Sequence, residues 1–174
     1  MDSEALKRHI RVVPDFPQPG ILFRDVTPLL QDPAALRASV EALVEPFREA
    51  GVEGVAGIES RGFIFGVPVA LALGVGFSPI RKSGKLPSET HRIDYALEYG
   101  SDALELHVDG VERGQRVLLV DDLIATGGTA AAGVELLRKA GAELVGSSFL
   151  IELAALGGRS RLADLPRHHA VLKY

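Results

Sequence analysis

The stretch that decides the fold is Val117-Leu-Leu-Val-Asp-Asp-Leu-Ile-Ala-Thr-Gly-Gly-Thr129. Its first four residues are apolar and partly β-branched, which is typical of a short strand buried at the centre of a sheet. Two carboxylates, Asp121 and Asp122, follow at once, and a protein core accepts such a pair only when the charges have partners. Residues 130–140 are Ala-rich and amphipathic, which predicts a helix.

The turn between this strand and this helix has the composition of an anion site. It consists of Ala125, Thr126, Gly127, Gly128 and Thr129. In such a turn the backbone N–H groups point outward, the threonine hydroxyls add donors, and the helix dipole favours negative charge. A phosphate fits these donors, whereas the acid pair upstream suits sugar hydroxyls, a bound Mg²⁺, or both. A tight turn beside a solvated acid pair is the alternative, and the two adjacent acids argue against it.

Composition narrows the classes of protein that the chain can be. Its 174 residues are 47% hydrophobic and 24% charged, which is typical of a globular protein with one domain. The net charge is −4 and the basic residues are scattered, so we expect neither a nucleic-acid partner nor an anionic membrane partner. The absence of cysteine excludes a thiolate nucleophile, and no apolar run is long enough for a membrane span. We therefore expect a cytoplasmic protein.

Short apolar runs alternate with amphipathic segments along most of the chain. The runs that predict strands span residues 54–58, 76–80, 117–120, 143–151 and 169–173. The segments that predict helices span residues 3–10 with Ser3 as the N-cap, 33–46 up to Pro46, 63–73 and 130–140. Residues 86–94 predict a mobile loop, and residues 95–98 and 103–107 predict a β-hairpin. This alternation predicts an α/β fold with a mostly parallel sheet.

Two further polar segments follow predicted strands, at the edge where open α/β sheets collect ligands. They are Glu59-Ser-Arg-Gly62 and Arg81-Lys-Ser-Gly-Lys85. Considered alone, the first is a capped helix start with a solvated arginine, and the second is a solvated basic turn. The second would also suit a ligand that carries several negative charges.

Five blocks of the sequence, in one order, resemble a known family. Residues 117–129 resemble the phosphoribosyl diphosphate (PRPP) signature of the type I phosphoribosyltransferases. Four others resemble the adenine enzymes of that family: Asp15-Phe-Pro-Gln-Pro-Gly-Ile-Leu-Phe-Arg-Asp25, Glu59-Ser-Arg-Gly-Phe63, Ile80-Arg-Lys-Ser-Gly-Lys-Leu-Pro87 and Leu97-Glu-Tyr-Gly100. The resemblance implies one phosphoribosyltransferase domain over residues 1–174, with helices flanking a mostly parallel sheet, an N-terminal hood over about 1–32 and a flexible lid over about 83–107.

The resemblance also implies the reaction. The family transfers the 5-phosphoribosyl group from PRPP to N9 of adenine, and the products are AMP and pyrophosphate. It implies that Mg²⁺ binds mainly through PRPP, with no firm protein ligand. It further implies a homodimer.

The resemblance assigns each candidate residue a role. Asp121 and Asp122 bind the ribose hydroxyls and assist catalysis, and the 5-phosphate binds Ala125, Thr126, Gly127, Gly128 and Thr129. The pyrophosphate group binds Glu59, Ser60 and Arg61, in a loop that often carries a cis non-proline peptide, and also binds Arg81, Lys82 and Lys85. The adenine site comprises Leu22, Phe23, Arg24 and Ala125. Glu98 handles the purine proton, and Tyr99 acts in closing the lid.

Two other functions remain open at this point. A phosphoribosyltransferase for hypoxanthine, guanine or xanthine would share the PRPP signature and differ only in the hood and the lid. A PRPP-sensing regulator would bind the same ligand and control DNA without catalysis. The regulator needs a basic face, which the sequence does not provide.

Overall fold

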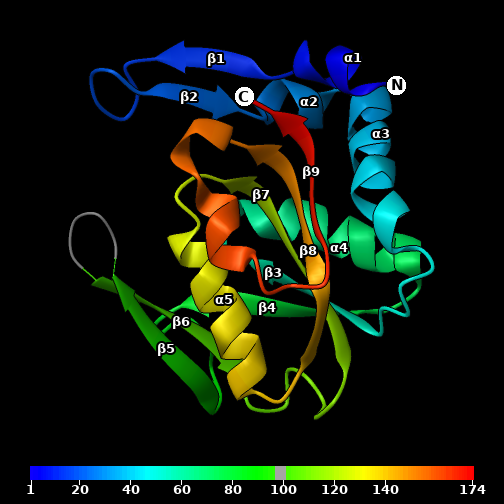
Figure 1. Ribbon diagram of the computed structural model, residues 1–174, viewed down its shortest axis with the longest axis vertical. Helices are drawn as coiled ribbons and strands as arrows, with labels where there is room; N and C mark the ends of the chain where they lie inside the picture. The colour runs from blue at the N-terminus through cyan, green and yellow to red at the C-terminus, as the bar shows by residue number, and fades with distance from the viewer. Residues whose placement is uncertain (97–100) are drawn as a thin grey trace.

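A seven-stranded sheet forms the centre of the computed structural model, which describes residues 1–96 and 101–174 (Figure 1). Across the sheet the strands are β5 (Thr90–Ala96), β6 (Ser101–His107), β4 (Gly76–Lys82), β3 (Gly54–Ile58), β7 (Arg116–Ile124), β8 (Glu143–Glu152) and β9 (His168–Lys173). Strands β4, β3, β7, β8 and β9 pair in parallel, whereas β6 is antiparallel to both β4 and β5. The mostly parallel α/β sheet is therefore confirmed.

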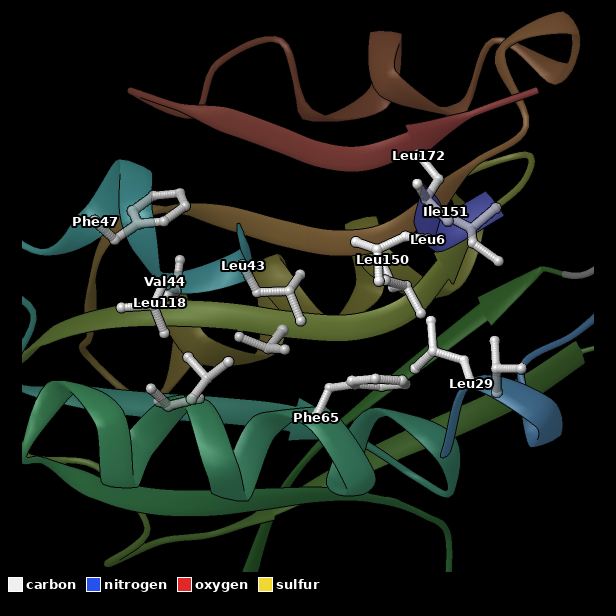
Figure 2. Packing of buried hydrophobic residues seen from close by; sticks show 14 of the residues in the cluster. Leu6, Leu29, Leu43, Val44, Phe47, Phe65, Leu118, Leu150, Ile151 and Leu172 are labelled. Atoms are coloured by element: carbon white, nitrogen blue, oxygen red, sulfur yellow. The ribbon is translucent and has the colours of Figure 1, made fainter. Parts of the chain in front are cut away.

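Helices cover both faces of this sheet because β7 is apolar on both. Leu118 and Val120 pack into one hydrophobic cluster with α3 (Pro33–Val44) and α4 (Arg61–Leu73), part of which Figure 2 shows. Val117 and Leu119, which alternate with them along the strand, pack into a second cluster with α5 (Gly128–Lys139). Such two-sided burial is typical of a central parallel strand. Among the described residues, no helix is long and apolar enough to cross a membrane.

The hood region contains elements that the sequence did not predict. They are the hairpin of β1 (Arg11–Pro14) and β2 (Leu22–Asp25), followed by α2 (Thr27–Gln31). Helix α1 (Ser3–Lys7) precedes them, and three 3-10 turns, η1 (Glu45–Phe47), η2 (Ala154–Leu156) and η3 (Gly158–Leu162), complete the chain. Figure 1 shows the hairpin as a separate layer next to the end of β9.

Several predicted boundaries were wrong. The N-cap of α1 is Asp2, whose carboxylate accepts the Ala5 N–H at 2.8 Å, and the helix ends at Lys7 rather than Ile10. Strand β5 occupies most of the loop expected over 86–94, because its residues pair with β6 from Thr90 onward. Strand β7 continues through both aspartates, since β8 pairs with it as far as Ile124. Helix α4 begins at Arg61, two residues before the predicted start at residue 63, and continues through Pro68.

Asp25 fixes the end of the hairpin to α2. Its carboxylate accepts the Thr27 N–H at 2.9 Å and lies 2.6 Å from Arg11 Nη2. The Thr27 hydroxyl, the Thr27 N–H and Arg11 together lower the pKa of Asp25 to about 2. Because the folded pKa lies below the unfolded value of about 3.9, the stabilisation is present above pH 4 and is lost as the pH falls toward 2.

The Asp25→Asn variant tests this pH dependence. We expect it to lower the free energy of unfolding by about 1 kcal/mol at pH 7, after allowance for solvent screening of Arg11. Urea unfolding of both proteins between pH 3 and pH 7 measures the difference, which should shrink toward the acid end. A difference that stays constant over this range would show that the charge of Asp25 is not its cause.

Candidate active site

One cleft lies where the carboxyl ends of β3, β4 and β7 meet, and its volume is about 550 Å³. It is lined by twelve of the candidate residues: Glu59, Ser60, Arg61, Lys82, Lys85, Asp121, Asp122, Ala125, Thr126, Gly127, Gly128 and Thr129. Parallel strands bring these segments together because their ends share one edge of the sheet. Glu98 and Tyr99 lie outside the described residues.

The acid pair forms the floor of the cleft. The Asp122 N–H donates to Asp121 Oδ1 at 2.8 Å, and Arg61 Nε lies 2.9 Å from Asp122 Oδ2 without hydrogen-bond alignment. The first turn of α4 lies close to Asp121 because Gly62 has no side chain. A Cβ at Gly62 would lie 2.7 Å from Asp121 Oδ1. Both aspartates line the cleft, and the buried Oδ2 of Asp122 accepts no hydrogen bond from the described residues.

Burial raises the pKa of both aspartates. For Asp121 the neighbouring charge of Asp122 adds to this effect, so its pKa lies well above the usual range. For Asp122 the guanidinium of Arg61 opposes the effect of burial. Two crowded, dehydrated acids are stabilised by ligand groups that donate hydrogen bonds, as the two hydroxyls of a sugar do.

The turn of residues 125–129 leads into α5 and leaves its N-terminus open. Gly127 has φ +78°, a left-handed conformation that favours glycine, and no side chain caps the helix. The N–H groups of the first turn are therefore available to an anion. The backbone of Gly158 packs against this turn so closely that a Cβ on Gly158 would lie 2.2 Å from the Ala125 carbonyl oxygen.

Replacement of Gly158 with alanine should displace this turn. If this turn holds the 5-phosphate of PRPP, as the resemblance implies, we expect at least about a tenfold rise in the KM for PRPP, because a misplaced phosphate site positions the ribose poorly. Steady-state kinetics at saturating adenine measure it. Gly76→Ala is the matched control, since a Cβ at Gly76 meets nothing within 4 Å. Equal KM values in the two variants would contradict the close packing.

On the opposite side of the cleft, Glu59 gathers the basic groups of the second polar segment. Its carboxylate accepts from Arg81 Nε at 2.9 Å, from the Lys82 N–H at 3.0 Å and from Lys85 Nζ at 2.6 Å. Burial would raise the pKa of Glu59, but Lys85 and the other two donors lower it below its usual value. The side chain of Lys82 lies 2.9 Å from Asp102. The structure thus places Glu59 beside the cations, where a negatively charged ligand would not bind it directly.

The remaining features of this loop bear on anion binding. The Glu59–Ser60 peptide is cis, as the resemblance implied. Arg61 also contacts the hood, since its guanidinium lies 5.4 Å from the ring centroid of Phe23. Of the three hood candidates, Phe23 thus faces Arg61 and Leu22 is exposed, but the guanidinium of Arg24 lies over the ring of Tyr174.

Comparison with known proteins identifies the family. Residues 25–170 match the phosphoribosyl transferase domain. The adenine phosphoribosyltransferase of Rhodopirellula baltica is 59% identical over 170 residues, which cover 97% of this chain and 82% of the relative. That of Thermosynechococcus vestitus is 60% identical over 161 residues, which cover 92% of this chain and 95% of the relative. The chain belongs to the adenine phosphoribosyltransferases.

Solved adenine phosphoribosyltransferases share the fold. The enzyme from Rhodothermus marinus has a TM-score of 0.94 at 55% identity, covering 99% of this chain and 98% of its own. The enzyme from Giardia lamblia, solved with 9-deazaadenine, has a TM-score of 0.94 at 36% identity, and the match covers 100% of this chain and 98% of that enzyme's chain. The type I phosphoribosyltransferase fold is thus confirmed.

Sequence reasoning assigned no role in this adenine phosphoribosyltransferase to Glu105, a buried acid on β6. Its carboxylate accepts from the Ser83 hydroxyl at 2.8 Å and from the Gly84 N–H at 2.9 Å. It thereby fixes the turn between the cations at 81–82 and Lys85. An acid between Leu104 and Leu106, both buried, was the available signal. For Gly158, the only signal in the sequence was the pair Gly157-Gly158. Such a pair indicates a turn but does not show which segment the turn contacts.

Proposed function

We propose that the chain transfers the 5-phosphoribosyl group of PRPP to N9 of adenine, giving AMP and pyrophosphate for purine salvage. One observation carries this function. In an adenine phosphoribosyltransferase chain, a single cleft joins an acid pair, an uncapped helix N-terminus and a cluster of cations. These three features match the ribose hydroxyls, the 5-phosphate and the pyrophosphate of one substrate.

The charges of the cleft fit the bond changes. The bond between ribose C1 and pyrophosphate breaks, and its electron pair leaves with the pyrophosphate oxygen. The lone pair of adenine N9 forms the new C1–N bond, and the N9 proton passes to a base. Arg81, Lys82, Lys85 and the backbone of residues 60–62 stabilise the departing anion, while Asp121 and Asp122 stabilise the cationic ribose ring. The 5-phosphate site positions the reacting carbon.

We also propose that Mg²⁺ takes part as the resemblance implies. When bound, the ion would neutralise charge on the pyrophosphate leaving group. Oxygen donors are the ligands that Mg²⁺ prefers, and the carboxylates of Asp121 and Asp122, which line the cleft, would supply such donors in addition to those of PRPP. No group of three metal-ligating side chains occurs among residues 1–96 and 101–174.

Glu98 is our candidate for the base that accepts the N9 proton, and Tyr99 for closure of the lid over about 83–107. A cationic sugar reacts with water, so the cleft must close during transfer. Glu98→Ala should lower kcat about 100-fold and remove the ionisation of Glu98 from the pH profile. Pre-steady-state turnover between pH 5 and pH 9 measures both changes. Near-normal turnover across this range would assign the proton to another group.

We further propose a cytoplasmic homodimer. The polyanion PRPP does not cross membranes unaided, which favours the compartment in which it is made. Helix α4 begins at the pyrophosphate side of the cleft and exposes Ile64, Val67 and Leu71, the last to 77%. A second copy would cover this apolar face. Sedimentation equilibrium of Leu71→Glu should show monomers if the face is the interface, and wild-type mass would exclude it.

The direct test of the reaction measures products. Purified protein, adenine, PRPP and Mg²⁺ should give AMP and pyrophosphate in equal amounts, and EDTA should stop the reaction. Tight PRPP binding without turnover of any base would instead support the sensing regulator.

A further inference from the structure

Strand β2 presents two neighbouring side chains to different parts of the molecule. Adjacent residues of a strand point to opposite faces. Accordingly, the ring of Phe23 faces the guanidinium of Arg61 at the cleft, at 5.4 Å from centroid to Cζ. The guanidinium of Arg24 instead lies over the ring of Tyr174, at 4.1 Å from its centroid. Phe23 and Arg24 therefore serve different surfaces, although both belong to the block that resembles an adenine site.

Tyr174 is the main partner of the Arg24 guanidinium. Arg24 Nε is buried and donates to no acceptor, and no carboxylate in the described parts of the chain lies within ion-pair distance of Arg24. Arg24 as a whole is half-buried, and a cation placed over an aromatic face is stabilised by the negative charge of that face. The aromatic ring thus compensates part of the charge of Arg24.

Tyr174 itself is fixed to the central sheet. Its N–H donates to the Glu152 carbonyl at 3.0 Å, and its carbonyl accepts the Ala154 N–H at 2.8 Å. Its ring packs against the hydrophobic cluster that contains α3 and α4. Figure 1 shows the end of β9, which leads into Tyr174, next to the hairpin of β1 and β2. Tyr174 is therefore a rigid point against which the hairpin can be located.

We infer that Tyr174 fastens the hood hairpin to the sheet through Arg24, and that this contact sets the position of Phe23 over the purine. Arg24 and Tyr174 are positioning residues in this arrangement, because their contact lies on the face of β2 opposite Phe23. The inference rests on the proposed function, which places adenine at the hood. It changes the role of Arg24, whose side chain acts through Phe23 rather than on the base.

Two substitutions at one position test the contact. Tyr174→Leu removes the aromatic face, whereas Tyr174→Phe keeps it. We expect Tyr174→Leu to raise the KM for adenine by about five- to tenfold, with kcat and the KM for PRPP within about twofold of wild type. Tyr174→Phe should behave as wild type. Amide exchange over residues 11–25 should be faster in Tyr174→Leu and unchanged in Tyr174→Phe.

Three results would overturn the inference. One is a wild-type KM for adenine in Tyr174→Leu, and another is an equal defect in Tyr174→Phe. The third is a parallel loss of kcat and PRPP affinity, which would indicate general damage. Arg24→Met provides a second variant if Tyr174→Leu does not fold. It should raise the KM for adenine by a similar factor and speed amide exchange over residues 11–25. The inference is overturned if Arg24→Met changes neither quantity.

A wild-type protein that makes no AMP would refute the proposed function but not the inference that Tyr174 holds the hood hairpin through Arg24. In that case, amide exchange over residues 11–25 in Tyr174→Leu and Tyr174→Phe would still test whether Tyr174 holds the hairpin. Where both single variants fold, Tyr174→Leu combined with Arg24→Met should be no worse than either alone, because both remove the same contact. Multiplied defects would contradict the inference.

Discussion

Alanine at Asp121 or at Asp122 should lower kcat/KM for PRPP at least about 100-fold while leaving the fold intact. Both residues line the cleft, and Asp122 Oδ2 accepts no hydrogen bond from the described residues. In the proposed function, removal of either one takes away a ligand for the ribose hydroxyls and a negative charge beside the cationic ring. Steady-state kinetics with varied PRPP measure the loss. Near-wild-type values for both variants would refute the ribose assignment.

The same pair should show an opposite effect on stability. Because burial and Asp122 raise the folded pKa of Asp121, its ionisation destabilises the ligand-free protein as the pH rises above about 4. Asp121→Asn removes this charge, so we expect its Tm at pH 7 to rise by roughly 3 °C while activity is lost. Asp109→Asn, at an exposed position, should change neither quantity. A lower Tm for Asp121→Asn would show that the protein already compensates the charge.

The second large effect is expected at Glu59. Glu59→Gln keeps the size of the side chain but loses the charge that gathers Arg81 and Lys85. We expect kcat/KM for PRPP to fall about 30-fold, because cations without a fixed partner no longer converge on the pyrophosphate. Glu135→Gln, an exposed substitution on α5, is the matched control.

The direction of the Glu59 effect discriminates between two roles. A positioning carboxylate orients the cations, so its loss weakens PRPP binding. A competing carboxylate would instead occupy the cations until PRPP displaced it. A lower KM for PRPP in Glu59→Gln would therefore contradict the positioning role.

Much of the fold follows from local patterns. Apolar runs such as 54–58 predicted β3 to the residue, because a strand buried on both faces must be apolar throughout. The hairpin of β1 and β2 escaped prediction because none of its strand residues is buried and the strands carry little alternation. The end of β7 was missed for another reason, since its pairing with β8 extends through two charged residues.

Part of the candidate site could likewise be predicted from the sequence, and part could not. Loops that follow predicted strands could be located from the sequence, because the topology of a parallel sheet brings strand ends together. The partners of each side chain could not, since they depend on contacts between distant segments. The pairing of Glu59 with Arg81, the packing of Gly158 on Ala125 and the stacking of Arg24 on Tyr174 are such contacts.

The most direct test of the central claim compares kcat/KM for adenine, hypoxanthine and guanine at saturating PRPP and Mg²⁺. In the proposed function, the hood and the lid distinguish an adenine enzyme from its oxopurine relatives. We predict that kcat/KM for adenine exceeds that for either oxopurine at least about 100-fold, since a site built for one hydrogen-bonding edge rejects another. Equal or greater turnover of hypoxanthine or guanine would contradict the account.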